Sequence, residues 1–245
     1  MDNIFLSKFL GHPPKASKFI DFIDKVFRRL APWVRIGSYW RGDMASIESR
    51  MNIFHLVNLV LSKDIQGDFV EVGCNTGEST VIIQNILQER SSDRTLYAFD
   101  SFEGVPDIHF ADEGVYTKGD MKATRKVFDL NFEKLNLKKP KTFAGWFQDT
   151  LYANLPTQIA FALIDADLYE STLIALKEVY KRLNKGAVCM FGVYWDNNAN
   201  INLTTDRKYH SPGVKKACDE FFADKPEKIN ILLAGNYTSG YFTKV

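Results

Sequence analysis

The sequence has few cysteines, almost no net charge and no long apolar run. Its three cysteines among 245 residues, Cys74, Cys189 and Cys218, are odd in number and widely spaced, which excludes a disulfide framework or a cysteine metal site. A formal net charge of +1 gives no support for a nucleic-acid-binding face. No apolar run approaches the roughly 20 residues that cross a bilayer, and the first residues lack the pattern of a signal peptide. We therefore expect a cytoplasmic protein without a nucleic-acid or membrane partner.

Repeats and low-complexity tracts are also missing, which excludes a solenoid. The N-terminal part instead looks helical: residues 15–30 and 44–64 both place apolar side chains at three- and four-residue spacing. We interpret residues 1–65 as a helical extension or lid and residues 66–245 as the main domain. The aromatic residues Trp33, Tyr39 and Trp40 suggest either a contact between subunits of a homo-oligomer or a lid, and both interpretations stay open.

From residue 67 onward, short apolar runs alternate with helical patterns. The predicted strands are 68–73, 95–100, 141–145, 158–167 and 186–193, and a hairpin covers 229–245. The predicted helices are 80–90, 122–136, 171–184 and 213–225. This alternation predicts an α/β fold with a doubly wound parallel sheet covered on both faces and an antiparallel hairpin at one end. Ligands of such sheets bind outside the carboxyl ends of the strands.

The turn after the first strand, "EVGCNTGEST", lacks the third glycine of the dinucleotide fingerprint. Glu71 in the strand would repel a phosphate, whereas Asp100, at the end of the second strand, can accept hydrogen bonds from ribose hydroxyls. A cationic adenosine ligand without phosphate satisfies both positions, and S-adenosylmethionine is such a ligand. The alternative is that Gly73 and Gly77 only form a turn and Asp100 only caps one.

Four motifs in order, "GDFVEVGCNTGEST", "YAFDSFEGVPD", "IDADLYEST" and "PGVKKACDEFF", resemble class I methyltransferases of the macrocin O-methyltransferase type. The resemblance covers roughly residues 44 to 245. It implies a Rossmann-like, seven-stranded α/β fold that uses S-adenosylmethionine to methylate hydroxyls on sugars of antibiotics and other glycosides.

The resemblance also implies the residues that hold the cofactor. Glu71, Gly73 and Ser79 would line its methionine part, Asp100 would bind the ribose, and the other implied contacts are Met44, Ser46, Ser101, Phe102, Gln148 and Asp149. Packing explains Phe102 and Met44 equally well, and Asp149 could instead cap a helix that starts at Thr150.

Asp165 and Asp167 end the fourth strand and carry the predicted chemistry. A sugar hydroxyl is a poor acid and a free aspartate has a pKa of about 4, so a lone carboxylate is a weak base unless positioning and burial help it. In the family that the chain resembles, the first aspartate binds a divalent metal such as Mg²⁺ and the second is the proposed general base. The alternative is that either residue only caps the helix at Ser171.

The pattern breaks at the fifth strand, where Gly192 and Val193 replace the family's pair of metal-binding acids. Three interpretations follow: a metal-free enzyme with Asp167 or His210 as base, a metal site of Asp165 rebuilt with Asp196, or a retired enzyme that only binds ligand. His210 lies near the end of a long polar segment that is predicted to cover the acceptor pocket. Another wall of this pocket is predicted to carry the candidate sugar contacts Tyr116 and Lys118.

We expect an S-adenosylmethionine-dependent methyltransferase whose partner is a sugar or glycoside hydroxyl. The alternatives are a non-catalytic binding protein on the same fold and a methyltransferase for an amine or catechol. An amine that is neutral near pH 7 would need neither a strong base nor a metal.

Overall fold

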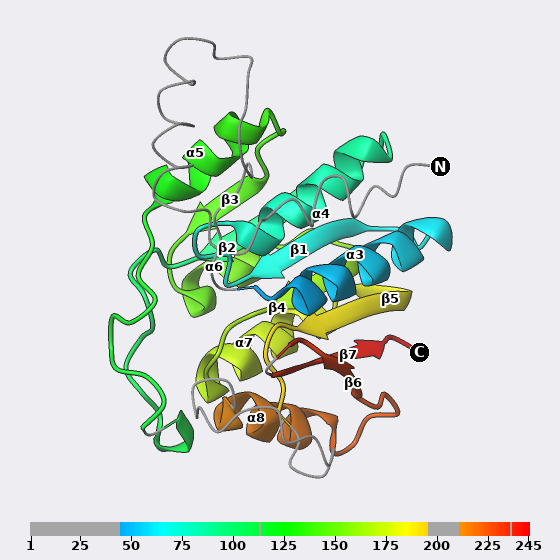
Figure 1. Ribbon diagram of the computed structural model, residues 1–245. Coiled ribbons are helices and arrows are strands. Elements are labelled where there is room, and N and C mark those ends of the chain that lie inside the picture. The colour runs from blue at the N-terminus through cyan, green and yellow to red at the C-terminus, as the bar shows by residue number, and fades with distance from the viewer. Residues whose placement is uncertain (1–44, 113, 196–210, 236) are drawn as a thin grey trace.

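A seven-stranded sheet organises the part of the chain described by the computed structural model, which is residues 45–112, 114–195, 211–235 and 237–245. The strand order is β3-β2-β1-β4-β5-β7-β6 (Figure 1). The five parallel strands are β1 (Asp68–Val72), β2 (Leu96–Asp100), β3 (Lys141–Ala144), β4 (Ile159–Ile164) and β5 (Leu183–Phe191). The order reverses beside β1, so the carboxyl ends of β1 and β4 flank the switch point where ligands bind in such sheets.

The two remaining strands form a terminal hairpin. β7 (Thr238–Thr243) pairs antiparallel with both β5 and β6 (Asn230–Leu233), so that the last strand inserts between two earlier ones. Its pairing places Gly240 opposite Phe191 at the carboxyl end of β5. The turn of the hairpin consequently lies at the same edge as the ends of the parallel strands.

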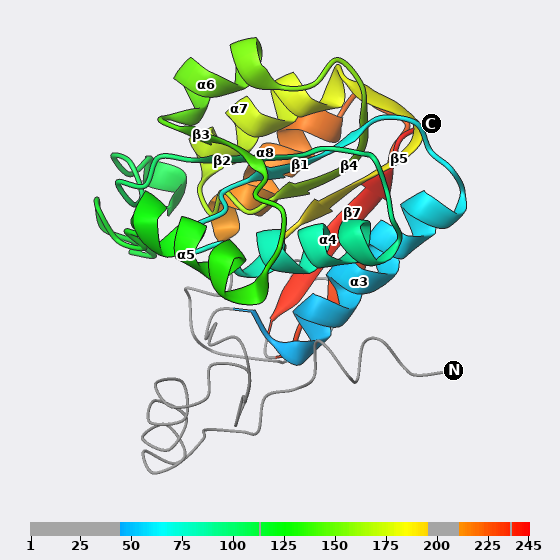
Figure 2. The same ribbon diagram turned by 90° about the horizontal axis from the view of Figure 1, so that it is seen from above.

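Helices cover both faces of the sheet (Figure 2). α3 (Ile47–Ser62), α4 (Glu78–Glu89) and α5 (Arg125–Leu135) lie on one face, and α6 (Phe147–Asn154), α7 (Tyr169–Tyr180) and α8 (Pro212–Phe222) lie on the other. β4 is buried along its whole length because both of its faces are covered, which fits its continuous apolar sequence. The predicted α/β architecture is confirmed.

α3 belongs to the packed structure. Ser46 is its N-cap and accepts a hydrogen bond from the Ser49 amide at 3.0 Å. Its apolar face contributes Ile53, Val57 and Val60 to a core cluster shared with the sheet. The proposed division of the chain at residue 65 stays a prediction, although α3, which precedes residue 65, shares this core with strands that follow it.

Several helix boundaries differ from those predicted. α7 starts at Tyr169 rather than at 171 and ends at Tyr180, which leaves Leu183 free to begin β5. Neither Asp165 nor Asp167 caps α7; its first backbone amide, at Tyr169, donates instead to Asp112 at 2.9 Å. Asp112 ends a short 3-10 helix (Phe110–Asp112), 57 residues upstream.

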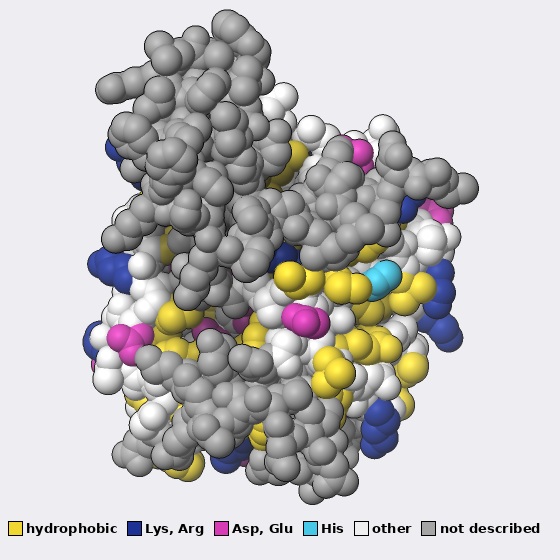
Figure 3. Space-filling view, viewed as in Figure 1, with side chains coloured by type: hydrophobic (Ala, Val, Ile, Leu, Met, Phe, Trp, Pro, Cys, Tyr) yellow, Lys and Arg dark blue, Asp and Glu magenta, His cyan; other side chains and the backbone are white. Residues whose placement is uncertain are grey.

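Within the described residues, no helix is both long enough and apolar enough to cross a membrane. Apolar side chains gather on the face formed by α3 and the β6–β7 hairpin (Figure 3), where the exposed members are Ile47, Met51, Leu59 and Leu233. The three cysteines are buried, and none is bonded to another.

Candidate active site

The turn after β1 brings the backbone of two strands into close contact. Gly73 has a φ of 91°, and a Cβ at this position would collide with the carbonyl oxygen of Asp165 at the end of β4. Only glycine fits there, because the conformation is left-handed and the space is filled. Gly77, with a φ of 86°, then starts α4. The expected strand, turn and helix are therefore present at the switch point.

Asp100 stands at the end of β2 and is held by backbone amides. Its Oδ2 accepts from the Asn75 amide and its Oδ1 from the Phe102 amide, both at 2.7 Å. Burial raises the pKa of this carboxyl, although the two amides oppose the effect. The carboxylate thus has a fixed orientation and lines a small cavity, and its predicted role in binding a ribose stays a prediction.

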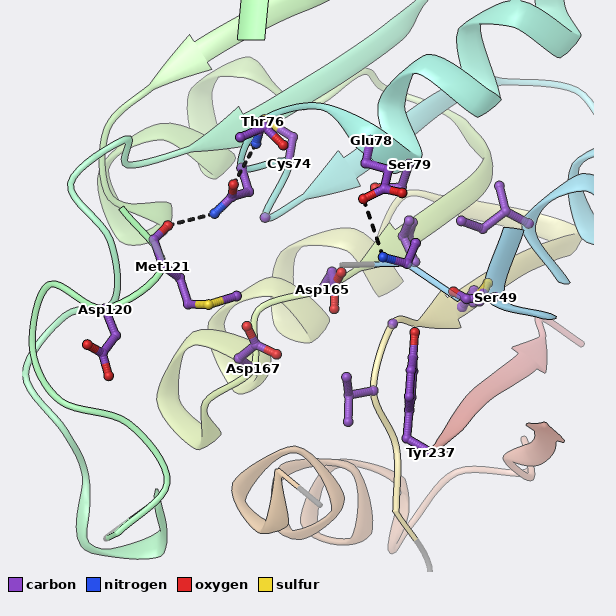
Figure 4. Close-up of a pocket in the computed structure, with 18 of the residues that line it drawn as sticks. Ser49, Cys74, Thr76, Glu78, Ser79, Asp120, Met121, Asp165, Asp167 and Tyr237 are labelled. Carbon is purple, nitrogen blue, oxygen red and sulfur yellow. Dashed lines mark hydrogen bonds between the residues drawn. The ribbon is translucent and has the colours of Figure 1, made fainter. Parts of the chain in front are cut away.

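Two cavities open along this edge of the sheet. The larger has a volume of about 450 Å³ and the smaller about 100 Å³. The smaller cavity is lined by Asp100, Ser101, Trp146 and Gln148 among others. Both are lined by Gly73, Asn75, Met121, Asp165 and Asp167. The two cavities therefore meet at the aspartate pair, and Figure 4 shows the pair between Met121 and Tyr237.

Asp165 and Asp167 lie side by side at the carboxyl end of β4, half-buried on the wall of both cavities. Burial and the neighbouring Asp165 raise the pKa of Asp167 well above its ordinary value, and burial also raises the pKa of Asp165. Asp167 has a φ of 59° and shares a hydrogen bond with the Tyr116 hydroxyl, which in turn bonds with Ser211. Carboxylates with raised pKa values in a cavity are suited to take up a proton.

Glu71 is fully buried in β1 and lines neither cavity among the described residues. Its Oε1 accepts a hydrogen bond from the Ser79 hydroxyl at the start of α4. Burial raises the pKa of Glu71 from 4.5 to about 8, so this carboxyl is largely protonated at neutral pH. Ser79 does line the larger cavity, and Glu71 fixes its orientation from behind.

The described residues do not fit the metal of the family that the sequence resembles. They contain no group of three His, Cys, Asp or Glu side chains placed to hold a metal ion. Gly192 stands where the first missing acid would be, and a Cβ there would collide with Oδ1 of Asp165. The carboxylate of Asp165 therefore lies directly against Gly192, in space that a side chain at that position would need.

The charged groups on the cavity walls are all acidic where the chain is described: Glu78, Asp100, Asp120, Asp165 and Asp167. Glu78 forms a buried ion pair with Arg50 of α3, which joins the starts of α3 and α4 at the cavity wall. Such a wall attracts a cationic ligand and disfavours a phosphate.

The predicted cofactor residues divide into two groups. Gly73, Ser79, Asp100, Ser101, Gln148 and Asp165 line one or both cavities. Ser46, Phe102 and Asp149 line neither cavity of the described part of the chain. Ser46 caps α3, and the ring of Phe102 packs 5.9 Å from that of Phe128. Asp149 lies in the first turn of α6, so the alternative that it caps a helix starting at Thr150 is wrong.

Three predicted residues lie outside the described part of the chain: Met44 for the cofactor, His210 as base and Asp196 as metal ligand. Trp33, Tyr39 and Trp40 also lie there. Of the two candidate sugar contacts, Tyr116 lines the larger cavity, whereas Lys118 is exposed and pairs with Asp107 at 2.9 Å. Every one of these roles stays a prediction.

Sequence reasoning missed the wall of the larger cavity opposite Asp167. Ser49 and Ile53 of α3, Met190 of β5 and Tyr237 of the terminal hairpin all line it. No local signal marks these positions, because each belongs to an ordinary amphipathic helix, a buried strand or a turn. Only the packing of α3 and the hairpin against the sheet brings them together.

Comparison with known proteins agrees with this geometry. The model of the family described as macrocin-O-methyltransferase (TylF) matches residues 43–215, more than half of the chain. The chain is 29% identical over 161 residues to the 8-demethyl-8-(2,3-dimethoxy-alpha-L-rhamnosyl)-tetracenomycin-C 4'-O-methyltransferase of Streptomyces olivaceus. It is also 29% identical over 163 residues to the demethyldecarbamoylnovobiocin O-methyltransferase of Streptomyces niveus. Each match covers 62% of this chain and 62% of the relative, which is less than two thirds of its length.

Solved structures share the fold. The O-methyltransferase NovP superposes with a TM-score of 0.66 at 25% identity, over 81% of this chain and 80% of that one. The calicheamicin methyltransferase CalS11 superposes with a TM-score of 0.61 at 18% identity, over 94% of each chain, which supports the fold alone. The sheet order, the glycine turn after β1 and the family match lead to one conclusion: the chain belongs to the macrocin O-methyltransferase family.

Proposed function

We propose that this protein transfers a methyl group from S-adenosylmethionine to a sugar hydroxyl of a glycan or glycoside, without a divalent metal. The observation that carries the proposal is the meeting of the two cavities at Asp165 and Asp167. A cofactor that extends from Asp100 along Gly73 brings its reactive end to that meeting point, and the larger cavity leaves room beyond it for an acceptor.

The relatives support a sugar-bearing acceptor by their names. One is a 4'-O-methyltransferase of a rhamnosyl-tetracenomycin, and another is the mycinamicin III 3''-O-methyltransferase of Micromonospora griseorubida, 26% identical over 163 residues. Both names place the methyl group on an oxygen. A cytoplasmic location and a homo-oligomeric state stay predictions.

The acidic wall supports the choice of cofactor. S-adenosylmethionine supplies an electrophilic methyl group on a positively charged sulfur, and it carries a second positive charge on its amino group. Asp165 lines the larger cavity as a carboxyl group and attracts these charges, whereas the charge of Glu78 is already paired with Arg50. Asp100, fixed by the amides of Asn75 and Phe102, offers its oxygens to the ribose hydroxyls.

Asp167 is the proposed base. The acceptor oxygen forms a bond to the methyl carbon while the carbon–sulfur bond breaks, and the hydroxyl proton passes to the Asp167 carboxylate. The products are a methyl ether and neutral S-adenosylhomocysteine, so charge and atoms balance. Tyr116 orients Asp167 by its hydrogen bond, and the partial burial of the pair limits the water that can solvate the carboxylate.

Metal independence is supported by Gly192 and Asp165. The Asp165 carboxylate lies against the glycine, so an acid restored at position 192 cannot be accommodated unless Asp165 moves. The cavity walls then orient the acceptor, and the enzyme relies on the position of the acceptor next to Asp167 rather than on a Lewis acid.

The test is methyl transfer from labelled S-adenosylmethionine to a panel of deoxysugar glycosides, amino-sugar glycosides and catechols, with EDTA and with Mg²⁺ in parallel. The proposal requires methylation of hydroxyl-only glycosides at equal rates in EDTA and Mg²⁺. Dependence on Mg²⁺ refutes the metal-free part and makes Asp196 the next residue to change. Transfer to amino sugars alone indicates an N-methyltransferase, and binding of S-adenosylhomocysteine with no turnover on any acceptor supports the retired enzyme.

A further inference from the structure

Tyr237 reaches the larger cavity from the terminal hairpin, and none of the predicted roles includes it. Its side chain lines the cavity and is only 7% exposed. In Figure 4 it stands on the opposite side of Asp165 from Met121, with its hydroxyl directed toward the start of α3. A buried aromatic side chain that lines a cavity is a typical ligand-binding element.

The ring is held in place from both ends. The hydroxyl hydrogen-bonds with the side chains of Ser49 and Ser46 at the start of α3. The turn that carries Tyr237 is tied to the same helix, because Ser46 Oγ donates to the Ala234 carbonyl at 2.9 Å and Asn52 Nδ2 donates to the Leu233 carbonyl at 2.7 Å. Tyr237 is therefore preorganised, which lowers the entropic cost of binding a ligand against it.

The same hairpin fixes the segment in which the metal-binding acids are missing. Ser239 Oγ donates to the Gly192 carbonyl at 2.7 Å, and the Tyr194 amide donates to the Thr238 carbonyl at 2.9 Å. Val193 lies between these two anchors and lines the cavity together with Tyr237. An apolar side chain and an aromatic ring thus form one wall next to Asp165.

This wall is at the end of the cavities away from the ribose site. Tyr237 and Val193 line the larger cavity but not the smaller one, which contains Asp100. Asp165 and Asp167, which line both, lie between the two ends. A group bound against Tyr237 is consequently on the far side of the aspartate pair from the adenosine.

Building on the proposed methyl transfer, we propose that Tyr237 binds the acceptor, with its ring packed against the apolar C–H face of the sugar. A pyranose ring presents such a face beside its hydroxyls, and an aromatic ring matches it in size and polarity. Packing against Tyr237 and Val193 fixes the sugar ring and so directs one hydroxyl toward Asp167. Tyr237 thereby acts as a specificity residue for the acceptor, while the adenosine of the cofactor is bound at the other end of the site.

The experiment compares Tyr237→Ala, Tyr237→Leu and Tyr237→Phe in the full-length protein, with Tyr152→Ala as matched control on an exposed face of α6. Steady-state kinetics on a methylated glycoside give KM and kcat, and calorimetry gives the affinity for S-adenosylhomocysteine. We expect Tyr237→Ala and Tyr237→Leu to raise the acceptor KM by about tenfold or more while the affinity for S-adenosylhomocysteine stays within about twofold. Tyr237→Phe keeps the ring and should raise KM less, and Tyr152→Ala should match the unaltered protein.

The outcomes separate this inference from the proposed function. An unaltered protein that methylates no glycoside refutes both. If the unaltered protein methylates glycosides and Tyr237→Leu has the same acceptor KM, the inference alone is refuted. The inference alone is also refuted if a Tyr237 variant loses affinity for S-adenosylhomocysteine but not for the acceptor. If the alanine variant does not fold, the leucine variant fills most of the same volume and makes the same comparison.

Discussion

The two ends of the ligand site are built by different means. At the end next to β1 and β2, Gly73 admits the close approach of Asp165, and the Asn75 and Phe102 amides hold Asp100. Each of these contacts involves the loops that directly follow β1, β2 and β4. At the other end, Ser49 of α3, Gly192 after β5 and Tyr237 of the hairpin meet from widely separated parts of the chain. After their proposed roles, we call these the cofactor end and the acceptor end.

The difference teaches where such a fold can change its substrate. The cofactor end depends on backbone conformation, which a side-chain substitution alters only with strain. The acceptor end depends on side chains supplied by a helix and a hairpin that pack onto the sheet. We therefore expect that the fold tolerates Gly192 and Val193 in place of an acid pair, and that their effect falls on how the acceptor is oriented.

The largest expected effect falls where the two ends meet. Asp167→Asn removes the proposed base but keeps the size of the side chain, and we expect kcat to fall by about 10²- to 10⁴-fold. Because Asp100 and Gly73 are unchanged, the affinity for S-adenosylhomocysteine by calorimetry should be close to that of the unaltered protein. A kcat within a few-fold of the original would leave Asp167 with a structural role only.

Gly192→Ala tests the packing of the acceptor end. The new Cβ collides with Oδ1 of the half-buried Asp165, so the backbone or the carboxylate must shift. We expect the free energy of unfolding to fall by about 1–3 kcal/mol, the range found when added atoms force neighbouring groups to shift. Denaturant unfolding measures this change in the free energy of unfolding for Gly192→Ala, with Val193→Ala as the control. An alanine at 192 that costs nothing would show that the Asp165 carboxylate has room to move.

Glu71 gives the cofactor end a dependence on pH. Its pKa is raised by burial from 4.5 to about 8, so the stability that it contributes as a neutral group is complete below pH 4.5 and is lost as the pH rises through 8. Glu71→Gln stays neutral throughout. Relative to the unaltered protein, its free energy of unfolding should rise by roughly 1.4 kcal/mol per pH unit between pH 5 and pH 7. Parallel stability curves for the two proteins would contradict a neutral Glu71.

The smallest effect is expected at the ribose. Asp100→Asn keeps one acceptor oxygen for the backbone amides but loses a charged acceptor, so the affinity for S-adenosylhomocysteine should fall by about tenfold. The acceptor KM, measured at saturating cofactor, should not change. The Tyr237 variants are expected to change the acceptor KM alone, and Asp100→Asn is expected to change the cofactor affinity alone. If Asp100→Asn changed only the acceptor KM, the assignment of separate cofactor and acceptor ends would be wrong.

Sequence reasoning located the strand-end residues of the cofactor end but not the wall of the acceptor end, and the ligand roles of both ends stay predictions. Gly73, Asp100 and Asp165 directly follow buried strands, and the edge to which such strands deliver their last residues is known from the fold class alone. Tyr237 could not be found in this way, because its position depends on the insertion of β7 between β5 and β6. The start of α7 was missed for the same reason: its first amide is satisfied by Asp112, 57 residues away, and not by the aspartates beside it.

The insertion of β7 has a consequence for how the protein is made. A chain emerging from the ribosome has completed β1 to β5, and with them Gly73, Asp100 and Asp165, before Thr238–Thr243 is synthesised. Until then the free edge of β5 is an unpaired strand, which is where growing chains pair with one another and aggregate. The segment that delivers Tyr237 to the acceptor therefore also closes this edge, so that a finished acceptor end and protection against self-association arrive in the same step of synthesis.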